Sequence, residues 1–214
     1  MKKMKKIALF VIAIFIGTMT FAQFHLGIKG GVSMSKLTTN INDVVEATRT
    51  GFQLGAFVRI GEKFHLQPEV YFTAKPGHIE FTTPSLADPN KKSNISEDIT
   101  FTSFDIPILV GYRLIKLPGG NIRLQAGPVA SIISNTKITV SRDGVEVPEQ
   151  DYPNNFNSFT WAAQFGAGVD FLFLTVDLRY ELGLSNLYDN SNNSGEDSTF
   201  KNNVFFLSVG WKIF

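Results

Sequence analysis

Apolar and polar side chains alternate without a break from residue 64 to residue 75. The apolar series is Phe64, Leu66, Pro68, Val70, Phe72 and Ala74, and the polar series is His65, Gln67, Glu69, Tyr71, Thr73 and Lys75. Because successive side chains of a β-strand point to opposite faces, the pattern predicts one long strand with an apolar and a polar face. Strands of soluble domains usually have about five or six residues, whereas a tilted strand that crosses a bilayer needs about nine to eleven. The length therefore favours a membrane wall.

Seven further segments alternate in the same way, which gives an even-numbered antiparallel set. The eight predicted strands are 24–34, 52–60, 64–75, 101–114, 122–133, 159–171, 174–184 and 205–213. Only a closed barrel leaves no strand edge unpaired in lipid, so we expect these strands to close on themselves. Pro68 has no N–H for a β-ladder, and we expect either a local bulge or an unpaired carbonyl beside it.

The connections between these strands are of two kinds. Three are tight turns, at 61–63, at 115–120 and around Leu172, and four are long and polar, at 36–49, 76–98, 134–158 and 186–202. Short turns at one rim and long loops at the other are typical of bacterial outer-membrane barrels. The sequence therefore predicts an all-β fold, an eight-stranded antiparallel up-and-down transmembrane β-barrel with short periplasmic turns and long extracellular loops.

Aromatic residues form two bands along the apolar faces. The predicted periplasmic band contains Phe24, Phe64, Tyr112, Phe171 and Trp211, and the band near the long loops contains Phe52, Phe72, Phe104, Phe159, Trp161 and Phe205. Two aromatic bands that flank an aliphatic middle match the profile of a membrane. A water-soluble barrel of the lipocalin type would instead turn the apolar face inward around a ligand cavity. The bands, the strand lengths and the N-terminal segment favour the membrane orientation.

The first 22 residues have the pattern of a cleaved signal peptide. Four lysines precede an uncharged, mostly apolar run at 7–21, and Thr20 and Ala22 place the cleavage before Gln23. We therefore expect residues 23–214 to form one barrel domain in the outer membrane. Removal of the segment takes four of the 20 basic residues and none of the 19 acidic ones, so the mature net charge is −3. We expect no nucleic-acid binding, and the lack of cysteine excludes disulfides and thiolate metal sites.

The polar faces of the strands point into the predicted lumen and carry charges of both signs. The predicted lumen cluster consists of Lys29, Arg59, Glu69, Asp105, Arg113, Arg123, Asp170, Asp177, Arg179, Glu181 and Lys212, with Lys75 on the same face. Eight strands enclose a space that side chains alone can fill, and an unpaired buried charge is strongly destabilising. We therefore expect a salt-bridged plug with a structural role. A narrow ion or solute path is the alternative.

No residue is assigned a catalytic, cofactor-binding or metal-binding role. His25 and His65 belong to inward faces near the periplasmic rim. His78 is the one histidine on the long-loop side, where a barrel hydrolase would need a histidine beside a nucleophile or an activated water. The segment 188–197 is only a weak approximation to a calcium loop. We therefore expect no enzyme activity and no cofactor.

A set of different short motifs is spread in order along nearly the whole mature chain. They are Gly-Ile-Lys-Gly-Gly-Val at 27–32, Phe-His-Leu-Gln-Pro-Glu at 64–69, Phe-Asp-Ile-Pro-Ile at 104–108, Gln-Ala-Gly-Pro at 125–128 and Gly-Trp-Lys-Ile-Phe at 210–214, with shorter pieces at 51–55, 165–168 and 178–180. This set resembles the PorT-like family of outer-membrane β-barrel proteins common in Bacteroidetes. The resemblance implies the fold and the compartment, whereas one member's role in protein secretion has no residues to map. Phe72 departs from the usual tyrosine, and Ile213 rather than Phe214 continues the lipid-facing series.

The expected function lies at the surface of the barrel. We expect an envelope or interaction role through loops 36–49, 76–98, 134–158 and 186–202, each a candidate contact for a protein partner. Outer-membrane lipid and, during biogenesis, the barrel-assembly machinery are the other expected partners. An accessory barrel of a transport or protein-secretion complex is the alternative, and an outer-membrane enzyme is the least expected.

Overall fold

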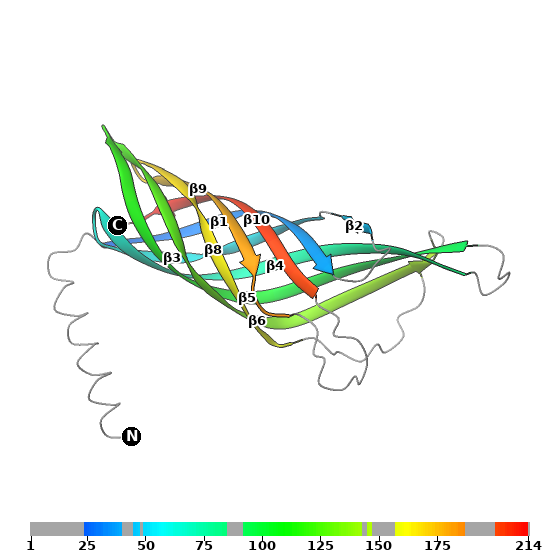
Figure 1. Cartoon of the computed structure of the whole chain (residues 1–214). Coiled ribbons are helices and arrows are strands. Elements are labelled where there is room, and N and C mark those ends of the chain that lie inside the picture. Colours follow the sequence, from blue (N-terminus) through cyan, green and yellow to red (C-terminus); the bar gives the residue numbers. More distant parts are fainter. Residues whose placement is uncertain are drawn as a thin grey trace, which may run out of the picture.

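Eight long antiparallel strands close into one barrel in the part of the chain that the computed structural model describes (Figure 1). The described residues are 24–39, 45–47, 49–84, 92–142, 145–146, 157–186 and 200–213, so the predicted signal peptide lies outside them. The barrel strands are β1 (Phe24–Thr39), β3 (Arg49–Ile60), β4 (Phe64–Pro84), β5 (Lys92–Leu117), β6 (Gly120–Arg142), β8 (Phe159–Phe171), β9 (Leu174–Gly183) and β10 (Phe200–Lys212), and β1 pairs with β10. The short strands β2 (Val45–Ala47) and β7 (Val145–Glu146) pair with β4 and β6. The predicted eight-stranded barrel is confirmed.

The strands turn their apolar residues outward and their polar residues inward. Phe64 and Leu54 expose 70% and 63% of their surface on the outer wall, whereas Gln67 and Asp177 are completely buried inside. A water-soluble protein has the opposite distribution, because burial of apolar surface stabilises its fold. This orientation excludes the soluble barrel with an apolar interior and matches a wall that faces lipid. The described residues include no helix long and apolar enough to cross a membrane.

Aromatic side chains contact one another at both rims of the apolar wall. The ring centroids of Phe64 and Tyr112 lie 4.8 Å apart near the short turns. Near the opposite rim, the rings of Phe72 and Phe104 lie 5.7 Å apart. Aromatic rings prefer the two interfaces between a membrane and water, so the two bands mark the depth at which the barrel sits.

Tight turns join the strands at the periplasmic rim. Gly61 and Gly119 have positive φ angles of 112° and 76°, a conformation that glycine adopts without steric cost. The second turn is shorter than predicted, because β5 continues to Leu117 and β6 begins at Gly120. A register shift between Arg113 and Ile115 lets the two strands stay paired through this region.

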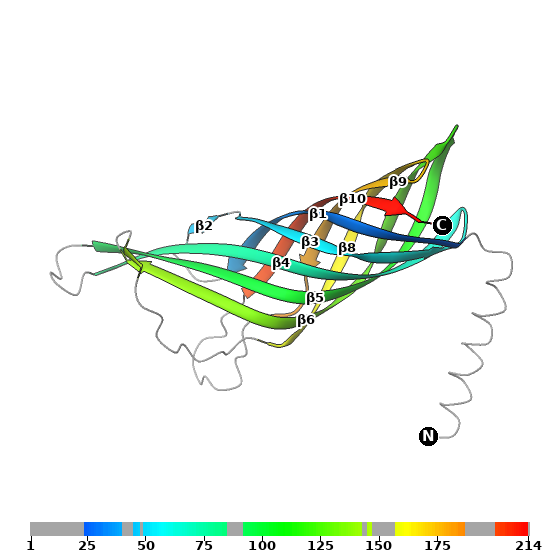
Figure 2. The same ribbon diagram turned by 180° about the vertical axis from the view of Figure 1, so that it is seen from behind.

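Three strands run far beyond the aromatic band at the extracellular rim (Figures 1 and 2). β4 reaches Pro84, β5 begins at Lys92 and β6 reaches Arg142, and we call these paired outer parts the extension. The structure therefore differs from the predicted loop limits: paired strand occupies 76–84, 92–98 and 134–142, and also 36–39, 45–47, 49 and 200–202. In the extension the buried Ile99 pairs with Ile138 and shares the inward parity of Asp105, so apolar residues take the face that is polar in the wall. The alternation of the wall therefore does not continue through the extension. Recurrent Thr, Ile and Val favour the strand, and the ladder supplies partners for its backbone groups.

Three prolines interrupt the ladders between neighbouring strands of the wall. Pro68 in β4, Pro107 in β5 and Pro128 in β6 border gaps in the β3–β4, β4–β5 and β5–β6 pairings. These gaps follow from the missing N–H of proline. The register is the same on both sides of each gap, so the wall accommodates Pro68 without a bulge.

An arginine at the middle of the outer wall should destabilise the barrel. Ile108 lies midway between Phe104 and Tyr112 of the two aromatic bands and is 46% exposed. In lipid vesicles, Ile108→Arg should lower the free energy of unfolding by about 2–4 kcal/mol, because its guanidinium would lie at the midplane. Thr139→Arg in the extension should cost about 0–1 kcal/mol in the same denaturant titration. Equal losses for the two variants would contradict the membrane orientation.

Candidate functional site

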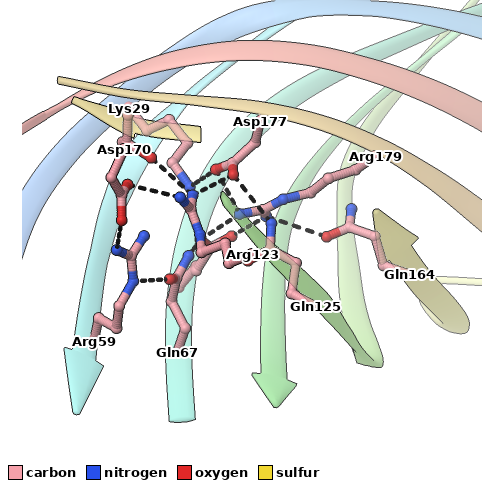
Figure 3. A network of polar contacts seen from close by, with 11 residues as sticks. Lys29, Arg59, Gln67, Arg123, Gln125, Gln164, Asp170, Asp177 and Arg179 are labelled. Carbon is pink, nitrogen blue, oxygen red and sulfur yellow. Dashed lines mark hydrogen bonds and ion pairs between the residues drawn. The ribbon is translucent and has the colours of Figure 1, made fainter. Parts of the chain in front are cut away.

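Charged side chains fill the centre of the lumen (Figure 3). Lys29 of β1 donates hydrogen bonds to Glu69 at 3.0 Å and to Asp177 at 2.5 Å. Arg179 of β9 donates to both carboxylate oxygens of Glu69, with 2.8 Å between Nη2 and Oε1, and to Asp177 at 3.0 Å. All four side chains are buried, so two cations and two carboxylates neutralise each other away from solvent.

A second group of charges lies on the periplasmic side of this centre. Asp170 accepts hydrogen bonds from Arg59 and Arg123, each at 2.6 Å. Arg123 also donates to Thr175 at 2.7 Å and to Asp177, which belongs to the central group. Asp177 therefore joins the two groups into one network, as Figure 3 shows.

A third group lies toward the extracellular end of the lumen. Lys75 Nζ is 2.8 Å from Asp105 and 2.6 Å from Glu181, and Ser103 donates to Asp105 at 2.9 Å. Lys75, Glu181 and Ser103 border a cavity of about 30 Å³. A cavity of this size has room for water but not for a larger solute, because one water needs at least about 10–15 Å³.

The structure brings together nine of the eleven residues of the predicted cluster, and Lys75 with them. The three groups set Lys29, Arg59, Lys75, Arg123 and Arg179 against Glu69, Asp105, Asp170, Asp177 and Glu181, so the two signs are equal in number. Arg113 and Lys212 lie apart, at the periplasmic rim. Arg113 pairs there with Glu62 at 3.2 Å, and the side chain of Lys212 has no hydrogen bond or ion pair with the described residues. Arg113 and Lys212 each directly follow an aromatic residue of the periplasmic band, which explains why they lie far from the charges in the centre of the lumen.

Neutral residues complete the network, and the alternation pattern does not reveal their roles. Gln67 accepts a hydrogen bond from Arg59 and donates one to Glu69, each at 2.5 Å. A Cβ atom at Gly168 would lie 2.5 Å from Cζ of Arg123, so this glycine leaves room for the guanidinium. The inward parity of both residues is the signal in the sequence that places them beside the charges.

A separate polar cluster lies outside the membrane, on the extension of β4 and β5. The ring nitrogens of His78 lie 2.7 Å from Asp98 and 2.8 Å from Glu80, and Arg49 lies 3.0 Å from Asp98. Burial lowers the pKa of His78, but hydrogen bonds to Glu80 and Asp98 outweigh it and raise that pKa above the ordinary value of 6.5. The structure thus places His78 in paired strand rather than in a loop.

The described residues contain no group of three histidine, aspartate or glutamate side chains that could hold a metal ion. The weak calcium-loop pattern at 188–197 falls outside the described part of the chain. The candidate polar sites are the lumen network, the cluster around His78 and the cations of the periplasmic rim.

The chain is similar to several solved barrels. Ail of Yersinia pestis, determined with the heparin analogue sucrose octasulfate, shares 11% identity at a TM-score of 0.38, over 89% of this chain and 99% of Ail. OprG of Pseudomonas aeruginosa shares 12% at 0.44, over 90% and 97%. The outer membrane enzyme PagL shares 12% at 0.36, over 86% and 99%. No curated protein matches the sequence, whereas a family model described as "Outer membrane protein beta-barrel domain" matches residues 21–189, most of the chain.

Removal of one central carboxylate should strongly destabilise the barrel. Asp177 contacts three cations, so Asp177→Asn leaves buried positive charge without compensation. We expect the free energy of unfolding to fall by about 3–5 kcal/mol in denaturant titrations monitored by gel migration. Glu62→Gln, which alters an exposed pair at the rim, should change it by less than about 1 kcal/mol. A similar small effect of both variants would contradict a stabilising network.

The order of the extension should depend on pH through His78. Because the pKa of His78 is raised in the folded protein, its hydrogen bonds contribute stability at a pH below 6.5, the ordinary pKa in the unfolded chain. This contribution is lost as the pH rises through the folded pKa. Hydrogen-exchange protection of β4 and β5 around His78 and Asp98, corrected for intrinsic rates, should therefore be greater at pH 6 than at pH 8.5. His78→Gln should abolish the difference, and an unchanged pH dependence in that variant would contradict the assignment.

Proposed function

Because the chain belongs to the outer membrane protein beta-barrel domain family and forms an outer-membrane barrel, we propose that it acts through its extracellular surface. In this proposal the charge-paired lumen keeps the barrel rigid and closed. The parts beyond the membrane make the contacts on which an envelope or interaction role depends. The observation that carries the proposal is the continuation of β4, β5 and β6 as paired strands beyond the extracellular aromatic band.

The extension offers an open strand edge to a protein partner. β6 pairs with β8 only as far as Ile132, whereas its pairing with β5 continues to Arg142. Among the described residues, the edge of β6 from Asn135 to Val140 has no second neighbouring strand. An exposed edge can accept an extended peptide as an additional strand through backbone hydrogen bonds. A partner with an extended segment suits this edge.

Two observations favour a closed, non-catalytic barrel over the alternatives. The lumen groups contain equal numbers of buried cations and carboxylates, which leaves no charge free to bind a passing ion. The ring nitrogens of His78 lie against carboxylates and Arg49 rather than against a hydroxyl nucleophile. Catalysis is therefore the weakest candidate function.

The finer assignments belong to the same proposal. The chain is proposed to be exported by a cleaved signal peptide at 1–22 and to belong among the PorT-like barrels of Bacteroidetes. The barrel-assembly machinery would insert it, and outer-membrane lipid would surround it. No nucleic-acid partner is proposed. The alternative is an accessory barrel of a transport or secretion complex, which a stable stoichiometric partner after purification in mild detergent would favour.

A photoreactive residue on the open edge should identify the working surface. At Lys137, which is exposed on β6 of the extension, it should give protein adducts in intact cells. At Ile108 in the middle of the lipid-facing wall it should give lipid adducts.

Planar bilayers with the purified protein should show no steady conductance. Steady single-channel currents, or identical adducts at the two positions, would contradict the proposal.

A further inference from the structure

A recess opens at the periplasmic end of the barrel, between the β5–β6 hairpin and the barrel mouth. Its volume is about 270 Å³, and its polar lining consists of His25, Glu62, Arg113, Lys116, Asn121 and Lys212. This volume is below the range of about 300–1,000 Å³ that is usual for pockets of drug-sized ligands. The recess therefore suits a small polar ligand.

Cations outnumber carboxylates around this recess. Glu62 is the one carboxylate in the lining, and it already forms ion pairs with Arg113 at 3.2 Å and with Lys116 at 3.8 Å. The side chain of Lys212 has no hydrogen bond or ion pair with the described residues. The lining thus contains three cations and one carboxylate, unlike the balanced network in the centre of the lumen.

The layer directly beneath the recess is also short of acceptors. Cross-strand pairing puts Arg59 opposite His25, and Arg123 opposite Arg113, so both arginines lie one step from the lining. They share Asp170, while Nη2 of Arg59 and Nε of Arg123 are buried without an acceptor among the described residues. A buried donor without an acceptor is destabilising, so an additional anion nearby would be stabilising.

The depth of the recess indicates which anion it meets. His25 follows Phe24, Arg113 follows Tyr112 and Lys212 follows Trp211, and these three aromatics belong to the periplasmic band. Such a band lies at the level of the lipid headgroups. The cations of the recess therefore lie at the depth of the phosphate groups of the inner leaflet and open toward the periplasm.

We propose that this recess binds a phosphate group, carried either by a small periplasmic phosphate ester or by the headgroup of an inner-leaflet phospholipid. Arg113 supplies a planar guanidinium that can bind two phosphate oxygens, and Lys116 and Lys212 supply point charges. Glu62 occupies Arg113 when the site is empty and competes with the ligand. This site is independent of the extracellular role proposed above, because it lies at the opposite rim.

Calorimetric titration of the full barrel in micelles of a neutral detergent tests the proposal, with sn-glycerol 3-phosphate as the probe. We expect saturable binding that Lys212→Gln and Arg113→Gln each weaken by about tenfold, the effect of one charge-assisted hydrogen bond. Glu62→Gln should strengthen binding, because it removes the internal competitor. Lys116→Gln, at a side chain that is 77% exposed, should weaken binding without any risk to folding. Lys137→Gln on the extracellular extension should leave the affinity unchanged.

Short-chain phosphatidylglycerol, titrated in parallel, separates the two sources of phosphate. Tighter binding of the lipid identifies an inner-leaflet headgroup, and equal or tighter binding of the soluble ester identifies a periplasmic ligand. Heat-dependent gel migration confirms that each variant is folded. A lack of saturable binding for both probes, or equal affinities in the native protein and all four recess variants, would overturn the proposal.

Discussion

Charge pairing inside a narrow lumen is the interaction on which the rest of this structure depends. A strand with one face in lipid must turn its other face inward, so every second residue of the wall enters a space that side chains alone can fill. Lys29, Glu69, Asp177 and Arg179 meet there without solvent, and each is stable only because the others neutralise it. The closed ladder supplies partners for the backbone groups of the wall, and the charge network supplies partners for its inward side chains.

Side-chain alternation predicts which residues lie inside, but not which residues they meet. The faces of the segment 64–75 follow from parity alone, and the structure agrees with every position. The charged partners of Glu69 are Lys29 and Arg179, 40 and 110 residues away in the sequence. That contact depends on the closure of β1 onto β10 and on the tilt of the strands, neither of which is written in the local pattern. The same limit explains why Gln67 and Gly168 gain their roles only in three dimensions.

The limits of the strands could not be predicted for a different reason. Alternation of apolar and polar residues marks the part of a strand that has lipid on one side, not the length of the strand itself. Beyond Lys75 both faces of β4 leave the membrane, so the pattern ends while the ladder continues to Pro84. Depth also changes the chemistry of inward residues. Arg113 and Lys212 share the parity of the central cations, yet at the rim they lie near solvent and lack the carboxylates of the centre.

The extension and the interrupted part of the wall belong to the same three strands. Pro68, Pro107 and Pro128 remove ladder hydrogen bonds from the part of β4, β5 and β6 within the membrane. Outside the membrane, β4 and β5 gain a further continuous ladder that runs to the pair of Pro84 and Lys92. The β4–β5 ladder keeps one register from the wall into the extension. The β5–β6 ladder shifts by one residue between Thr102 and Ser103, so β6 enters the extension through a bulge. Beyond this bulge, pairing with β5 holds the open edge of β6 as far as Arg142, and a partner strand added there would extend the same ladder.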